Sequence, residues 1–158
     1  MSVKILDQNM VAKIIEKKNK IFVENLINHL MRCGKKQQAQ NIIVKTGLFL
    51  GKQTNKKLFI IYTDVFNRIR PYVEVKKVRV RRTTYMVPFP TNIQRQKHLA
   101  AQWLLDTIRK DKRKLNFQIK FKEEIIKILL NRGETIEKKK EMYKKAEKSR
   151  SFMHYRWY

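Results

Sequence analysis

The chain has 158 residues, of which 38 are Lys or Arg and 13 are Asp or Glu, so its formal net charge is +25 at neutral pH. Such a charge destabilises an isolated compact fold by self-repulsion, so a polyanionic partner is expected, and nucleic acid is the commonest one. The hydrophobic content of 42% is ordinary for a globular domain and excludes a disordered basic tail. No apolar run is long enough to cross a bilayer, and the single cysteine, Cys33, excludes an intrachain disulfide.

Apolar residues at helical spacing predict three helices before position 71. The first covers about 19–32 and is followed by Gly34, where a C-terminal cap would stand. The second ends near Gly51, and the third stops before Pro71 because the residue before a proline disfavours helix. The apolar positions are Phe22, Val23, Leu26, Ile27 and Leu30, then Ala39, Ile42, Ile43, Phe49 and Leu50, then Leu58, Phe59, Tyr62, Val65, Phe66 and Ile69.

The most regular pattern follows at 71–90, PYVEVKKVRVRRTTYMVPFP, where valines alternate with polar residues. A period of two is typical of strands with one packed and one free face, so this segment is predicted to form a basic β-hairpin. Its free positions carry Lys76, Lys77, Arg79, Arg81 and Arg82. The valines change phase across Lys76 and Lys77, which predicts a bulge or a twist. An exposed row of like charges repels itself, which favours a phosphate backbone as partner.

A fourth helix is predicted after the hairpin, with Thr91 or Asn92 as its cap. Its core positions are Ile93, Ala100, Trp103, Leu104 and Ile108. On the opposite side Arg95, Gln102 and Arg109 recur every seven residues, which predicts a cationic stripe on the exposed face.

The basic linker DKRKLN at 111–116 leads into two further helices. The fifth is carried by Phe117, Phe121, Ile125, Ile128 and Leu129 and is predicted to close at Gly133. The sixth, at about 134–148, is almost all charge, with Ile136, Tyr143 and Ala146 as its apolar side. The tail SRSFMHYRWY at 149–158 has no helical period, so we expect it to be poorly ordered alone and to stack on bases or on a neighbouring protein.

Together these elements predict a mainly α fold, a bundle of about six helices with one projecting basic β-hairpin between helices three and four. We divide the chain into a basic N-terminal arm at 1–18, a helical RNA-binding domain at 19–148 with its hairpin at about 71–90, and an aromatic and basic C-terminal tail at 149–158.

Catalysis and metal binding have little support in the sequence. The histidines His29, His98 and His154 fall in separate segments without a second ligand beside them. The candidate carboxylates Asp106, Glu123 and Glu124 lie among lysines and form no paired acid and base. We therefore expect no enzyme activity, no metal, no cofactor and no small-molecule substrate.

Several segments, in order from about Val23 to the C-terminus, resemble the small-subunit ribosomal protein S-seven family in an organellar version. They are NLINHLMRCGKKQQAQNII, YVEVKKVRVRRTTYMVP, HLAAQWLLDTIRK and EKKKEMYKKAEKSRSFMHYRW. Frequent Lys, Asn and Ile with few Gly and Ala are typical of an AT-rich genome. We expect a mitochondrial location first and a plastid one second.

The sequence departs from the family pattern at three places. Arg81 and Arg82 stand where the family commonly has two glycines, and because two-residue primed turns need positive φ, we expect a wider or displaced turn. Leu115-Asn116-Phe117 replaces a Ser-Met type of cap before the fifth helix, and Tyr143 stands at the position of a usual histidine.

The resemblance implies a protein that binds the 3′ major domain of small-subunit ribosomal RNA and nucleates assembly of the head. It also implies neighbouring ribosomal proteins as partners, with the hairpin and C-terminal part near the exit-site tRNA and the mRNA path. The predicted RNA-binding residues are Lys17, Lys18, Lys20, Lys35, Lys36, Lys76, Lys77, Arg79, Arg81, Arg82, Arg95, Arg109, Lys112, Arg113, Lys114, Arg150, Arg156 and Trp157.

A DNA-architectural protein with a basic β-arm remains the alternative, because that class also places a ribbon on a helical base. Such arms usually carry an apolar wedge at the tip and work as dimers. Here the tip is Arg81-Arg82-Thr83, and no coiled-coil seam is evident.

Overall fold

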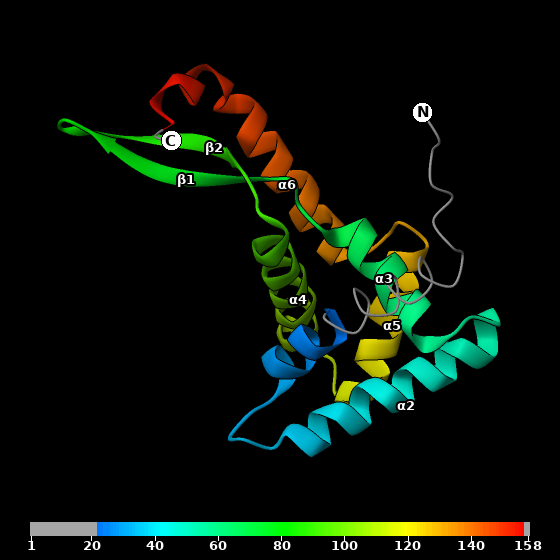
Figure 1. Cartoon of the computed structure of the whole chain (residues 1–158). Coiled ribbons are helices and arrows are strands. Elements are labelled where there is room, and N and C mark those ends of the chain that lie inside the picture. Colours follow the sequence, from blue (N-terminus) through cyan, green and yellow to red (C-terminus); the bar gives the residue numbers. More distant parts are fainter. Residues whose placement is uncertain (1–21, 157–158) are drawn as a thin grey trace, which may run out of the picture. The chain divides into compact units, whose positions relative to one another are not determined.

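A computed structural model describes residues 22–156 of the chain. Its elements are a helix at 22–30, then α2 (Lys36–Thr54), α3 (Leu58–Ile69), β1 (Val73–Val80), β2 (Thr83–Pro90), α4 (Ile93–Lys110), α5 (Phe117–Leu129), α6 (Glu134–Lys148) and the 3-10 helix η1 (Arg150–Tyr155) (Figure 1). The two strands form one antiparallel hairpin between α3 and α4. The predicted fold class is confirmed. No helix in the described part is long and apolar enough to span a membrane.

The chain separates into two compact units, with the boundary inside α3 between Val65 and Phe66. The predicted division into arm, domain and tail remains a prediction. In the first unit the core contains Phe22, Leu26, Ile43, Leu50, Ile61 and Tyr62. The Tyr62 hydroxyl donates a hydrogen bond to the Ile43 carbonyl at 2.9 Å, which ties α3 to α2, and burial raises the pKa of that hydroxyl. Phe49 and Phe59, two of the apolar residues whose spacing predicted these helices, are exposed.

The second unit contains the hairpin and helices α4 to α6. Its core contains Leu99, Ala100, Leu104, Leu105 and Ile108 of α4, Phe121, Ile125 and Ile128 of α5, Ile136 of α6 and Val87 of β2. The predicted core spacing of α4 holds for Ala100, Leu104 and Ile108, while Trp103 is half-buried. Ile93 is exposed, contrary to the prediction, because it is the first residue of the helix and precedes the turns that pack.

The connection between α5 and α6 differs from its prediction. The fifth helix ends at Leu129, and Asn131 rather than Gly133 takes the left-handed conformation after it, with φ of 56°. Gly133, with φ of 105°, instead precedes the first residue of α6. The buried Glu124 carboxylate accepts hydrogen bonds from the Thr135 hydroxyl at 2.7 Å and its backbone N–H at 3.4 Å, and so caps the first turn of α6.

Candidate nucleic-acid interface

The two strands of the hairpin pair without interruption. Val73 lies opposite Pro90, Val80 lies opposite Thr83, and every intervening residue has one partner. Of the two predicted alternatives, a bulge or a twist, the bulge is therefore wrong. Val73 and Val75 lie on one face of the ribbon and Val78 and Val80 on the other, because side chains alternate between faces along an unbroken strand. The valines thus change phase because the first two lie on one face of the ribbon and the last two lie on the other.

The turn is a tight one. The register leaves only Arg81 and Arg82 between the strands, so the predicted wider or displaced turn is also wrong. Arg81 takes a positive φ of 54°, a conformation that costs a residue with a Cβ roughly 1–2 kcal/mol. The Thr83 hydroxyl donates a hydrogen bond to the Val80 carbonyl at 3.2 Å across the turn. The strands thus pair continuously although Arg81 takes an unfavourable backbone conformation.

The ribbon has two chemically different faces. We call the first the cationic face; its outer half carries Lys77, Arg79, Thr84 and Met86, all exposed. We call the second the aromatic face; it carries Val78, Tyr85, Val87 and Phe89, all half-buried or buried. Lys76 lies on the aromatic face, with its ammonium 5.5 Å from the centre of the Phe89 ring. Only two of the three strand cations therefore share the cationic face.

The C-terminal turn η1 lies beside the hairpin (Figure 1). Its ring contacts are with the aromatic face. Tyr85 stacks with Tyr155 at 4.9 Å between ring centres and meets Phe152 at 5.0 Å. The Arg156 guanidinium donates a hydrogen bond to the Pro88 carbonyl at 2.7 Å and lies 5.8 Å from the Phe89 ring centre. Residues 150–155 have no helical period, yet they form the 3-10 helix η1, because contacts distant in sequence hold this segment against the hairpin.

Two predicted RNA contacts lie along α4. Arg95 makes a bidentate pair with Glu74 of β1, through Nε at 3.0 Å and Nη2 at 2.7 Å. The hydrogen bonds from Arg95 lower the pKa of the Glu74 carboxyl. Arg109 is exposed in the last turn of the helix. The stripe is thus on the polar face, as predicted, but the charge of Arg95 is matched within the fold.

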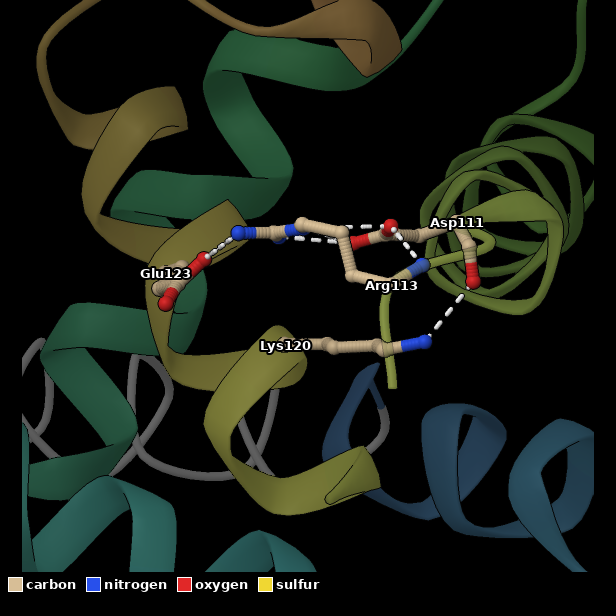
Figure 2. Close-up of polar contacts among 4 residues, drawn as sticks. All are labelled: Asp111, Arg113, Lys120 and Glu123. Carbon is tan, nitrogen blue, oxygen red and sulfur yellow. Dashed lines mark hydrogen bonds and ion pairs between the residues drawn. The ribbon is translucent and has the colours of Figure 1, made fainter. Parts of the chain in front are cut away.

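The linker after α4 contains a second such network (Figure 2). The Arg113 guanidinium lies between two carboxylates, at 2.6 Å from Asp111 Oδ2 and 2.7 Å from Glu123 Oε2. Its hydrogen bonds lower the pKa of Asp111 to about 2. Lys120 donates to the Asp111 carbonyl at 2.7 Å. Lys112 and Lys114 are exposed, and their side chains have no hydrogen-bond or ion-pair partner among residues 22–156.

The remaining predicted RNA-binding residues lie at the starts of helices or outside the described part of the chain. Lys35 and Lys36 are exposed at the start of α2, and Arg150 is exposed at the start of η1. Lys17, Lys18, Lys20 and Trp157 lie outside the described residues.

The contact of Lys139 could not be predicted from the sequence; its ammonium donates a hydrogen bond to the Arg68 carbonyl at 2.7 Å. These residues are 71 apart, so no local signal could have paired them.

A pocket of about 540 Å³ lies beside the turn, lined by Val80, Arg81, Arg82, Thr83, Tyr85 and Tyr155. It combines guanidinium groups with aromatic rings, the pair of groups that contacts phosphates and unpaired bases in RNA-binding proteins. Among the described residues, no three His, Cys, Asp or Glu side chains are grouped so that they could hold a metal ion.

A helical protein that projects a hairpin with cations at its tip and on one face has the features of a nucleic-acid-binding protein. The sequence profile of the family described as ribosomal protein S7p/S5e matches residues 2–150. The chain is 34% identical over 139 residues to the small ribosomal subunit protein uS7 of Thermosipho africanus (strain TCF52B), covering 88% of this chain and 89% of that protein. It is 36% identical to the protein of the same name from Wigglesworthia glossinidia brevipalpis, with 88% of each chain covered.

The small ribosomal subunit protein uS7m of Reclinomonas americana is 34% identical over 131 residues, covering 83% of this chain and 82% of that protein. The chain belongs to the ribosomal protein S7p/S5e family. The resemblance to this family is therefore confirmed, while its organellar version remains a prediction.

Proposed function

We propose that this protein is a structural constituent of the small ribosomal subunit that binds the 3′ major domain of its RNA and nucleates assembly of the head. Family membership supports the first part of the proposal. The observation that carries RNA binding is the group of four exposed cations on the outer hairpin, Lys77, Arg79, Arg81 and Arg82, whose side chains have no hydrogen-bond or ion-pair partner in the described part of the chain. Unmatched charge at a projecting tip favours an anionic partner from outside.

Lys35, Lys36, Lys112, Lys114 and Arg150 extend the proposed contacts beyond the hairpin, since all five are exposed and their side chains make no hydrogen bond or ion pair to residues 22–156. Lys17, Lys18, Lys20 and Trp157 remain predictions. The spread of cations over the helix starts, the hairpin and the linker suits an irregular RNA fold better than one groove of a DNA duplex.

The hairpin tip and C-terminal turn are proposed to lie near the exit-site tRNA and the mRNA path. The pocket of arginine and tyrosine side chains beside the turn supports this, because such groups contact phosphates and unstacked bases. Neighbouring ribosomal proteins are the other proposed partners, and no enzyme activity is proposed. The uS7m relative supports a mitochondrial location. Bacterial relatives of equal identity are also compatible with other locations.

Competition between nucleic acids tests the RNA-binding proposal. At physiological salt, the 3′ major-domain RNA is expected to displace a labelled RNA at concentrations at which a random DNA duplex of equal length does not. Equal competition by the duplex would instead favour the architectural alternative.

The salt dependence of RNA binding tests the hairpin cations. Lys77→Gln with Arg79→Gln should lower the slope of log affinity against log salt by up to about two. Lys52→Gln with Lys57→Gln, two exposed lysines elsewhere, is the charge-matched control.

A further inference from the structure

Glu74 is the only carboxylate in the hairpin segment 71–90, which otherwise carries five Lys and Arg residues. A negative charge in such a ribbon weakens its attraction for phosphate, so its presence calls for another role. Its side chain is only 13% exposed. Both of its oxygens accept hydrogen bonds from Arg95, at 3.0 Å and 2.7 Å, in the fork geometry that fixes orientation as well as distance.

Apart from this pair, hydrogen bonds hold the hairpin at the ends of its strands, and β1 also packs against α6 and β2 against η1. The Thr91 backbone N–H donates to the Tyr72 carbonyl at 3.0 Å, and its hydroxyl donates to the Pro71 carbonyl at 2.9 Å. Gln96 of α4 donates to the Thr91 carbonyl at 2.9 Å. These bonds tie the entering and leaving chain together at one place, whereas the Glu74–Arg95 pair joins the inside of β1 to α4. The pair therefore restrains rotation about the base.

A small rotation at this base has a large effect at the tip. Val80 lies six positions after Glu74, which corresponds to about 20 Å of extended strand. Over that length a rotation of about 10° moves the tip by about 3 Å. The cations at the turn are the ones proposed to contact RNA, so their position depends on what fixes the base.

We propose that Arg95 is a positioning residue, which pairs with Glu74 to set the direction of the hairpin relative to α4 and is not itself a phosphate contact. This inference rests on the proposed RNA-binding function, and it replaces the prediction that Arg95 binds RNA. It also explains the carboxylate, because an isolated arginine on α4 could not hold the strand by a bidentate pair.

Pulsed electron resonance between two spin labels measures the direction of the hairpin. The labels are attached to Thr84→Cys and Gln102→Cys, both exposed, in a chain in which Cys33 is replaced by serine. Arg95→Gln and Glu74→Gln should each broaden the distance distribution and shift its maximum by about 3 Å. The charge swap Glu74→Arg with Arg95→Glu should restore it. Asp64→Asn, which breaks the exposed Lys56–Asp64 pair and changes the charge as Glu74→Gln does, is the control.

Unchanged distances in both single variants, or no recovery in the charge swap, would overturn the proposal. Affinity for the 3′ major-domain RNA gives the second measurement. A positioning role leaves the salt slope of Arg95→Gln unchanged, and the charge swap binds as the unaltered chain does. A slope lowered by about one in Arg95→Gln, without recovery in the swap, would show a phosphate contact. Absence of RNA binding would reject the proposed function but would leave the spin-label result standing.

Discussion

Tyr155 of η1 stacks on Tyr85 of β2, with their ring centres 4.9 Å apart and their planes inclined by 27°. The contact joins residues from opposite sides of α4, α5 and α6 in sequence. A two-stranded hairpin is marginally stable alone in water, and packing on a further element is what usually stabilises it. The C-terminal turn is that element here, since it covers the aromatic face while leaving the cationic face exposed.

A double-mutant cycle on Tyr85→Ala and Tyr155→Ala should give a coupling free energy of about 0.5–1.5 kcal/mol in urea unfolding, the range found for aromatic pairs. Met153→Ala, at an exposed position of the same turn, should show no coupling with Tyr85→Ala. Deletion of 149–158 should likewise lower the melting temperature, because it removes both Tyr155 and the Arg156 bond to Pro88. Zero coupling for the tyrosine pair would mean that the tail docks independently of the hairpin.

Lys139 supports the end of α3. Burial, with a smaller effect of the Arg70 charge, lowers the pKa of its ammonium, which donates to the Arg68 carbonyl in the last turn of that helix. A cation at a helix C-terminus meets the negative end of the dipole. Lys139→Ala should therefore reduce the free energy of unfolding by about 1–2 kcal/mol. Lys140→Ala, at an exposed neighbouring position, should stay within about 0.5 kcal/mol of the unaltered chain.

Gly34 and Gly133 both have positive φ, but they differ in how closely other atoms would surround an added Cβ. A Cβ at Gly133 would lie 3.1 Å from Glu124 Oε1 and 3.2 Å from Lys127 Cβ, whereas a Cβ at Gly34 would meet no atom within 4 Å. Gly34→Ala should cost about 1 kcal/mol through its backbone alone. Gly133→Ala should cost at least about 1 kcal/mol more, because its φ is less favourable and the Glu124 cap must move. Equal losses in denaturant unfolding would contradict a role for that contact.

The Asp111 carboxyl should titrate with a midpoint near 2 when followed by carbon NMR. Hydrogen bonds from Arg113 depress its pKa, so the stability that the pair contributes is present above the ordinary value of 3.8 and is lost as the pH falls through about 2. Arg113→Gln should move the midpoint up towards 3.8. Lys112→Gln removes an adjacent positive charge that makes no such bond, and the midpoint in that variant should stay near 2.

Local periodicity predicted the helices well. The spacing of Ala100, Leu104 and Ile108 placed them in the core, and the alternation at 73–80 predicted a strand. These patterns are reliable because a helix or strand presents its residues to one neighbour at a fixed period. At the turn, however, the local preference of Arg81 for negative φ predicted the wrong geometry, since strand pairing outweighed it.

Partners distant in sequence were outside the reach of such patterns. The sequence showed that Arg95 lies on the polar face of its helix, but Glu74 is 21 residues away on another element. Arg156 and the Pro88 carbonyl are 68 residues apart. Composition indicates that a cation is present, while only the fold indicates whether that cation already has a partner.

Arg81 lowers the stability of the fold through its left-handed backbone, and its side chain contributes a cation to the proposed RNA contact. Glycine adopts that conformation without the penalty of a Cβ, so Arg81→Gly should raise the free energy of unfolding by up to about 1 kcal/mol. The same change removes a guanidinium from the pocket beside the turn, and translation by particles that carry the variant should fall. Arg82→Gly removes an adjacent charge without relieving a positive φ and should not stabilise the fold. Selection for thermal stability alone would therefore favour glycine at position 81 and leave the tip with one cation fewer.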